Sequence, residues 1–163
     1  MTEQRLFPAI VLAASIAVLG GAFLFQYIGG LAPCVLCIYQ RYPYGITIAL
    51  SVLALIVAEP RMRAGALALC GIAFLVGAGI GVFHVGVEQH WWEGTAACTG
   101  NVSAGTSLEA MKAQLLAAPI VRCDRVAWSL FGISMAGYNV LISLGLAGFS
   151  LAAARRVFRR TER

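Results

Sequence analysis

Four long apolar runs dominate this chain, and they constrain its fold more than any other feature. They cover about residues 8–27, 42–58, 64–85 and 126–153. The chain is 60% hydrophobic and only 12% charged, whereas a water-soluble domain is about 45–50% apolar and about 25% charged. Because about 20 apolar residues suffice for a helix to cross a bilayer, the sequence predicts an all-α fold. We expect a membrane four-helix bundle that forms one domain.

One longer polar segment, about residues 86–125, separates the third run from the fourth. Within it, Thr106 and Glu109 have the spacing of a helix-capping box. Apolar residues then recur at helical spacing, and Pro119 ends the pattern. We therefore expect a short amphipathic helix in this loop. It would either lie flat on the membrane surface or pack on the protein itself.

The positive charges lie at the ends of the apolar runs rather than in one patch. With four spans, one side of the membrane carries eight of the twelve Lys and Arg residues: Arg5, Arg61, Arg63 and the five arginines of the C-terminal tail. The positive-inside rule places that side in the cytoplasm. We therefore expect a bacterial inner-membrane protein with both termini cytoplasmic and the long loop in the periplasm. The net charge of +5 reflects this topology, and we expect no nucleic-acid binding.

Four of the five cysteines lie on the side predicted to be periplasmic, where disulfides persist. These are Cys34, Cys37, Cys98 and Cys123. Cys70 instead lies in the middle of the third apolar run, so we expect it to be a small packing residue. The charge count and the cysteine positions are independent observations, and they agree on the orientation.

Cys34 and Cys37 form a Cys-x-x-Cys pair within the segment PCVLCIYQR, residues 33–41. Thiols at this spacing can close a disulfide ring and open it again. Arg41 lies near the membrane boundary, where an arginine needs a partner such as a thiolate or an oxygen of a reducible ligand. The spacing alone leaves a redox pair, a static disulfide and half of a metal site open. Pro43 also leaves open whether the pair belongs to the second helix or to a separate turn.

Cys98 and Cys123 form a second candidate pair, in the loop. Small residues surround Cys98, whereas Arg122 and Arg125 flank Cys123, where their charges would favour the thiolate. For an isolated pair, a structural disulfide remains the alternative. A zinc site made of all four cysteines is disfavoured, because structural zinc sites usually combine two close pairs and this chain has one. We therefore expect no metal.

His84 and Glu88 lie at the outer end of the third run, four residues apart and therefore on one helical face. A lone histidine in this position is most often an ordinary interfacial side chain. At the membrane depth of Cys37 and Arg41, it could instead give a proton or a hydrogen bond to a bound reducible ligand.

These features together closely resemble the disulfide-bond formation protein B (DsbB) family over nearly the whole chain. The resemblance rests on the four runs, the 33–41 motif after the first run and the second cysteine pair after the third. Three further segments also resemble the family: His84–Glu88, Trp91–Gly94 and Cys123 with the following Trp128–Gly132.

The resemblance implies a protein-dithiol:quinone oxidoreductase of the bacterial inner membrane. Such an enzyme reoxidises a periplasmic thioredoxin-fold thiol oxidase (DsbA-like) and passes the electrons to a membrane quinone, either ubiquinone or menaquinone. Two readings from other classes remain. One is a thiol–quinone enzyme of the vitamin K epoxide reductase type, and the other is a non-catalytic membrane protein braced by disulfides.

The resemblance also implies a role for each site residue. Cys34–Cys37 and Cys98–Cys123 would be redox-active disulfides. Cys98 would form the mixed disulfide with the oxidase, and Cys123 would exchange with Cys34. Cys37 would face the quinone, with the charge of Arg41 beside it. In the same way, His84 would be a quinone-proximal residue.

Overall fold

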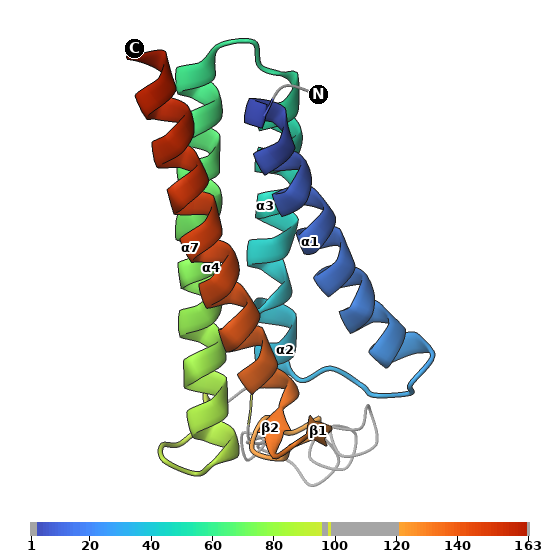
Figure 1. Ribbon diagram of the computed structural model, residues 1–163. Coiled ribbons are helices and arrows are strands. Elements are labelled where there is room, and N and C mark those ends of the chain that lie inside the picture. Colours follow the sequence, from blue (N-terminus) through green and yellow to red (C-terminus); the bar gives the residue numbers. More distant parts are fainter. Residues whose placement is uncertain (1–2, 96–97, 99–120, 163) are drawn as a thin grey trace, which may run out of the picture.

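The computed structural model describes residues 3–95, 98 and 121–162, and these form the expected all-α membrane bundle (Figure 1). The predicted amphipathic helix near residues 106–119 lies outside the described residues. The elements in chain order are α1 (Glu3–Tyr27), α2 (Val35–Tyr39), α3 (Arg41–Ile56), α4 (Pro60–Glu88), β1 (Ser129–Leu130), β2 (Ile133–Ser134) and α7 (Met135–Thr161).

Helices α1, α4 and α7 are each long and apolar enough to cross a membrane. Helix α3, with 16 residues, is shorter than the others. Large apolar side chains on the outer faces of the helices remain exposed, among them Ile16, Leu24, Ile72 and Leu144. Such an apolar exterior is expected where lipid, rather than water, surrounds the helices. That α3 also spans the membrane, and the limits of all four spans, stay a prediction.

The helices pack in the order α1, α3, α4, α7, while α1 and α7 make few contacts with each other. Helix α1 tilts away from the bundle toward the end where α2 and the two strands lie (Figure 1). Both chain termini lie at the opposite end (Figure 1). The first and last helices therefore diverge toward the end that carries α2.

Helices α4 and α7 approach closely because small residues line their contact. A Cβ atom at Gly71 would meet the Leu151 side chain, and one at Gly81 would meet Val140. Glycine at such positions lets two helix backbones come together within a membrane. Beside this contact, Tyr44 and Phe74 pack edge to face in the buried core, with ring centroids 5.7 Å apart.

The cysteine motif is a separate turn rather than the start of the second long helix. Helix α2 has Cys34 as its N-cap, whose sulfur accepts a hydrogen bond from the Cys37 backbone N–H at 3.2 Å. Gln40 separates α2 from α3. Pro43 lies in the first turn of α3, where a helix leaves its N–H groups without partners in any case. The cysteine pair therefore belongs to a separate turn, α2, and not to the second long helix, α3.

Helix α7 begins at Met135, although the last apolar run begins near residue 126. The intervening residues form a hairpin in which Ser129 pairs with Ser134 and Leu130 pairs with Ile133. Phe131 and Gly132 make its turn with φ values of 50° and 78°. Positive φ at both central residues is what a two-residue hairpin turn requires. Hydropathy counts these apolar residues as part of a span, but it does not register the chain reversal.

Arg63 has a structural role that its charge alone did not indicate. Its side chain is buried and donates hydrogen bonds to the carbonyl oxygens of Ala54 and Val57, at 2.9 and 2.7 Å. These carbonyls end α3 and have no partner within the helix.

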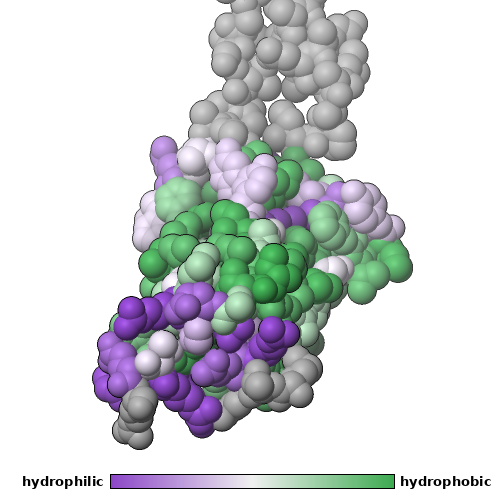
Figure 2. Space-filling view, turned by 90° about the horizontal axis from the view of Figure 1, so that it is seen from above, coloured by the Kyte–Doolittle hydropathy of each residue, from purple (hydrophilic) through white to green (hydrophobic). Residues whose placement is uncertain are grey.

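Hydrophilic residues gather at this end of the bundle, near the termini (Figure 2). Four of them line one shallow polar depression: Arg155, Arg156, Arg159 and Arg160.

Candidate functional site

The structure brings the four predicted active cysteines together at the end of the bundle that carries α2. Cys34, Cys98 and Cys123 are buried in one cluster with Leu36 and Val87. Cys37 packs against the same cluster. The fifth cysteine, Cys70, belongs to the central core instead and lies among apolar side chains, as expected of a packing residue.

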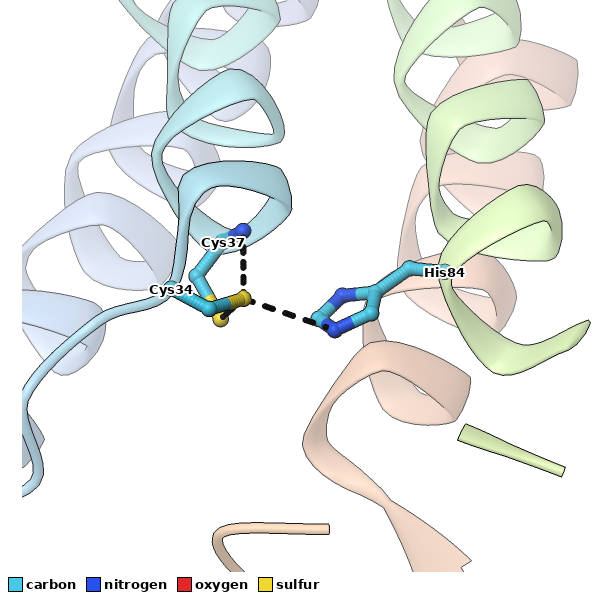
Figure 3. A group of neighbouring side chains, drawn as sticks. All are labelled: Cys34, Cys37 and His84. Carbon is cyan, nitrogen blue, oxygen red and sulfur yellow. Dashed lines mark hydrogen bonds between the residues drawn. The ribbon is translucent and has the colours of Figure 1, made fainter. Parts of the chain in front are cut away.

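Cys34 and Cys37 lie within reach of a disulfide bond. Their sulfur atoms are 2.8 Å apart, on one side of the α2 turn (Figure 3). The hydrogen bond from Cys34 is the main cause that lowers the pKa of Cys37 to about 7, while burial opposes it. The same interaction raises the pKa of Cys34. The reduced pair therefore shares one proton, held on Cys34, and leaves Cys37 as the thiolate.

Cys123 links the loop pair to the α2 pair. Its thiol lies close enough to the thiols of Cys98 and Cys34 for both to affect its pKa. Its backbone N–H also donates to the Cys98 carbonyl at 3.2 Å. The four sulfurs are thus arranged in the order Cys98, Cys123, Cys34, Cys37. Each step along this order joins neighbours, which is the arrangement that successive thiol–disulfide exchange requires.

The expected effect of the arginines on Cys123 is wrong. Burial raises the pKa of Cys123 to about 11, followed by the contact with Cys98. Arg122 does not oppose this, because its guanidinium is engaged by Asp124 in an ion pair on the exposed side. That pairing lowers the pKa of Asp124 to about 2. Arg122 is next to Cys123 in the sequence, but its side chain pairs with Asp124 instead.

His84 extends from α4 toward Cys34 (Figure 3). Its Nε2 atom lies 3.5 Å from the Cys34 sulfur, and its Nδ1 atom lies 2.7 Å from the side-chain amide nitrogen of Gln40. His84 therefore lies at the same depth as the cysteine pair, as we expected from the sequence. Gln40 was not predicted as a partner, because the two residues are 44 apart in sequence.

Arg41 lies beside the pair but takes its main contacts from α1. Its Nη1 donates to the Gln26 side-chain oxygen at 2.6 Å, and the guanidinium sits 5.0 Å from the centre of the Phe23 ring. Such a stacked and hydrogen-bonded arginine is held in a fixed position. Gln26 was missed by the sequence reasoning. Its only signal was that it is a polar residue near the end of an apolar run.

A cavity of about 510 Å³ adjoins these residues. Its apolar walls come mainly from α1, with Ala22 and Phe25, and from α7, with Ala136 and Ile142. Its polar side includes Cys34, Cys37, Arg41, His84 and Glu88. A cavity of about 300–1,000 Å³ with a few placed polar groups is typical of a small-molecule site. The cavity lies at the end of the bundle that carries α2, with residues of both α1 and α7 in its lining.

The sulfurs of Cys34 and Cys37 and the His84 Nε2 atom are close enough to be considered as metal ligands, all within 4.8 Å of one another. Zinc accepts thiolate and imidazole ligands at about 2.3 and about 2.0 Å. Two sulfurs bound to one tetrahedral zinc would then be about 3.8 Å apart, whereas these two are 2.8 Å apart. The spacing therefore favours disulfide chemistry over metal binding.

Four cysteines in linear order, placed at the end of a membrane bundle and beside an apolar cavity, define a membrane protein for thiol–disulfide exchange. Comparison with known families agrees. The family described as "Disulfide bond formation protein DsbB" matches residues 4–153. The chain belongs to this family, and it is therefore an oxidoreductase of disulfide bond formation.

Individual relatives support the same assignment. Disulfide bond formation protein B of Methylococcus capsulatus is 32% identical over 144 residues, covering 83% of this chain and 84% of the relative. Disulfide bond formation protein B 1 of Pseudomonas aeruginosa is 28% identical, covering 93% and 94%. An uncharacterized protein of Rickettsia prowazekii is 31% identical, covering 90% and 86%. No solved structure matches the chain.

Proposed function

We propose that this protein reoxidises a DsbA-like periplasmic thiol oxidase and passes the electrons to a membrane quinone. The observation that carries the proposal is the order of the four sulfurs, which ends at the wall of an apolar cavity. Cys98 lies at one end of this order and Cys37 at the other. The protein would therefore accept electrons at the loop and deliver them at the membrane.

The exchange steps balance without any metal. In the first, the partner's dithiol reduces the Cys98–Cys123 disulfide, and the partner leaves as a disulfide. In the second, the Cys98–Cys123 dithiol reduces Cys34–Cys37 through the contact of Cys123 with Cys34. In each step a thiolate attacks a disulfide sulfur and another thiolate leaves. The two electrons then reside on Cys34 and Cys37.

The cavity residues fit a quinone head group. The walls are apolar, as a flat lipid-soluble ring needs, and the polar side carries positive charge, with Arg41 beside the cysteine pair and Arg122 and Arg125 also lining the cavity. Cys37, the thiolate of the pair, faces the same space. When bound, a quinone would supply an acceptor for two electrons and two protons. The protein's own residues would hold the ring, exclude water and keep Cys37 charged beside it.

The proposed orientation puts the cysteine end of the bundle in the periplasm and both termini in the cytoplasm. The arginine-rich end of the bundle lies opposite the cysteines, which suits the positive-inside rule. Disulfides persist in the oxidising periplasm, so a disulfide that the protein makes in its partner would not be reduced again there. The bacterial inner membrane borders the periplasm and contains quinone, so we assign the protein to this membrane.

A trapping experiment tests the partner step. Cys123→Ala removes the thiol that resolves a mixed disulfide at Cys98, so an adduct with a purified DsbA-like oxidase should accumulate on non-reducing gels. Cys70→Ala is the matched control, since Cys70 lies in the core, and it should behave as the unmodified protein does. If no adduct forms through Cys98, the proposed exchange with the partner oxidase is contradicted. Disulfides that only stabilise the structure would then be the better explanation.

A second measurement tests the electron acceptor. Purified protein in bilayers should oxidise the reduced partner only when ubiquinone or menaquinone is present, and quinol should form in equal amount. Quinone reduction that proceeds equally well with a small dithiol in place of the partner would instead favour an enzyme of the vitamin K epoxide reductase type.

A further inference from the structure

Glu88 is a buried carboxylate in the wall of the cavity that the cysteine pair adjoins. It is 8% exposed, at the end of α4. One carboxylate oxygen accepts a short hydrogen bond from the Ser134 hydroxyl, and the other lies 3.9 Å from His84 Nε2. An ionisable group buried at a membrane boundary is costly, and carboxylates in such positions are used in proton relays.

His84 lies between this carboxylate and Cys34. The same Nε2 atom that faces Glu88 is 3.5 Å from the Cys34 sulfur. On the other side of the ring, the Gln40 amide contacts Nδ1 at 2.7 Å. An amide can donate with its nitrogen or accept with its oxygen. Gln40 can therefore hold the imidazole in place in either tautomer, and also when both ring nitrogens carry protons.

The proposed reaction needs a proton acceptor at this position. The reduced pair holds one proton on Cys34, while Cys37 is the thiolate. Closing the Cys34–Cys37 bond releases that proton and two electrons. The electrons go to the quinone acceptor, whereas the proton must leave a buried thiol. Neither Arg41 nor the sulfur of Cys37 can take it, since the first is already protonated and the second enters the new bond.

We propose that Glu88 is the proton acceptor of the Cys34 thiol, reached through His84, during closure of the Cys34–Cys37 disulfide. This inference rests on the proposed thiol–quinone function and adds to it a carboxylate that acts through His84. The S–H bond of Cys34 breaks, the S–S bond to Cys37 forms, and the carboxylate becomes a carboxylic acid. Ser134, the N-cap of α7, holds the Glu88 carboxylate in place beside His84.

The charged groups around the carboxylate are compatible with this role. Arg41 from α3 and Arg122 and Arg125 from the segment before β1 line the same cavity, as does Tyr138 from α7. The charge of Glu88 acts to raise the pKa of Cys37, whereas the charge of Arg41 acts to lower it. Neutralising the carboxylate should therefore favour the Cys37 thiolate, which gives a readout that needs no quinone.

The test compares Glu88→Gln with Glu93→Gln, an exposed glutamate on the same side of the protein. The fully reduced protein is mixed with quinone in bilayers, and disulfide closure in a single turnover is followed by trapping free thiols. Glu88→Gln should slow closure by about 100-fold, as loss of a general base does, while Glu93→Gln should not change it. Glu88→Asp should restore part of the rate, and Ser134→Ala should cost only about 3- to 10-fold.

Two quinone-free measurements separate this proposal from the function on which it rests. Closure driven by a small soluble disulfide should also be slow in Glu88→Gln. In the same variant, the pH midpoint of Cys37 alkylation should move to lower pH. If unmodified protein is not oxidised by quinone but these two effects remain, the quinone function fails and the role of Glu88 stands. If Glu88→Gln closes as fast as Glu93→Gln with both oxidants, the proton-acceptor role is overturned.

Discussion

Cys34 and Cys37 differ in charge although only two residues separate them. Cys34 caps the α2 turn, and its sulfur faces both the Cys37 backbone N–H and the Cys37 sulfur. Cys34 therefore keeps the shared proton, and Cys37 becomes the thiolate. At the scale of single residues, this inequality places the negative charge on the sulfur whose thiolate form the charge of Arg41 favours.

The first prediction concerns the pH dependence of Cys37. Its pKa is lowered to about 7, so the thiolate is present above that pH and is lost as the pH falls through it. In fully reduced protein, the alkylation rate of Cys37 by iodoacetamide should show a midpoint near pH 7, and Cys34 should stay unreactive there. Mass spectrometry of the labelled peptides measures both. Equal rates for the two cysteines would contradict the shared-proton arrangement.

The second prediction concerns Arg41. Arg41→Ala removes the positive charge that acts on Cys37, together with its contacts to Gln26 and Phe23. We expect the KM for quinone to rise about 10- to 100-fold, the usual effect of losing a charge-assisted hydrogen bond. Mixed-disulfide formation with the partner through Cys98 should be unaffected. Arg61→Ala, at the opposite end of the bundle, is the control, and unchanged quinone kinetics in Arg41→Ala would remove Arg41 from the site.

The sequence alone singled out the residues to which the proposed function assigns the chemistry, but not the residues that hold them in place. Cys34, Cys37 and Arg41 could be chosen because local spacing places them together. Gln26, Gln40 and Ser134 could not, because each reaches its partner only through packing between helices distant in sequence. Adjacency also misled at Arg122, which pairs with Asp124 rather than acting on Cys123.

At the scale of elements, two short pieces position the site: the α2 turn and the β1–β2 hairpin. Both occur in apolar sequence, and hydropathy therefore merged the hairpin with the last span. The turn signal was present as Phe131–Gly132, but it lies within an apolar stretch. Hydrophobic periodicity predicts long helices reliably because many residues contribute to the pattern. A two-residue turn depends on only two residues, so its sequence signal is easily missed.

The third prediction concerns Gly86, near the end of α4. A Cβ there would overlap the Trp92 ring, which stacks on Phe83 and donates to the Phe83 carbonyl at 2.9 Å. Gly86→Ala should displace Trp92 and destabilise the protein by about 1–3 kcal/mol. Gly79→Ala on the same helix meets no neighbouring atom and should stabilise it by up to about 1 kcal/mol. Thermal unfolding in detergent measures both, and effects of the same sign would refute the packing argument.

At the scale of the whole molecule, α1 packs on α3, α3 on α4 and α4 on α7, while α1 and α7 make few contacts with each other. These two diverge toward the cysteine end, and the cavity lies between them. The number of long helices and the common side of the cysteines were predictable from apolar runs and charge. The divergence was not, because the tilt of a helix depends on which side chains it meets rather than on its own composition.

The fourth prediction tests the cavity. Ala22 lines it on α1, so Ala22→Phe should fill part of the space and raise the KM for quinone about tenfold or more. Trapping of the partner at Cys98 should remain, because the loop end is untouched. Ala13→Phe places the same ring on an exposed face of α1 and should leave the kinetics unchanged. Equal kinetics for the two variants would show that the acceptor binds elsewhere.

The position of the cavity also bears on how the protein is made. Its two apolar walls come from the first and the last helix of the chain. A ribosome that has delivered α1 to α4 into the membrane has already supplied Cys34, Cys37 and His84, but only one wall. A nascent chain stalled before α7 would therefore carry the thiol pair without a place for its acceptor. Under the proposed function, the chain would become able to pass electrons to quinone only after α7 had been inserted.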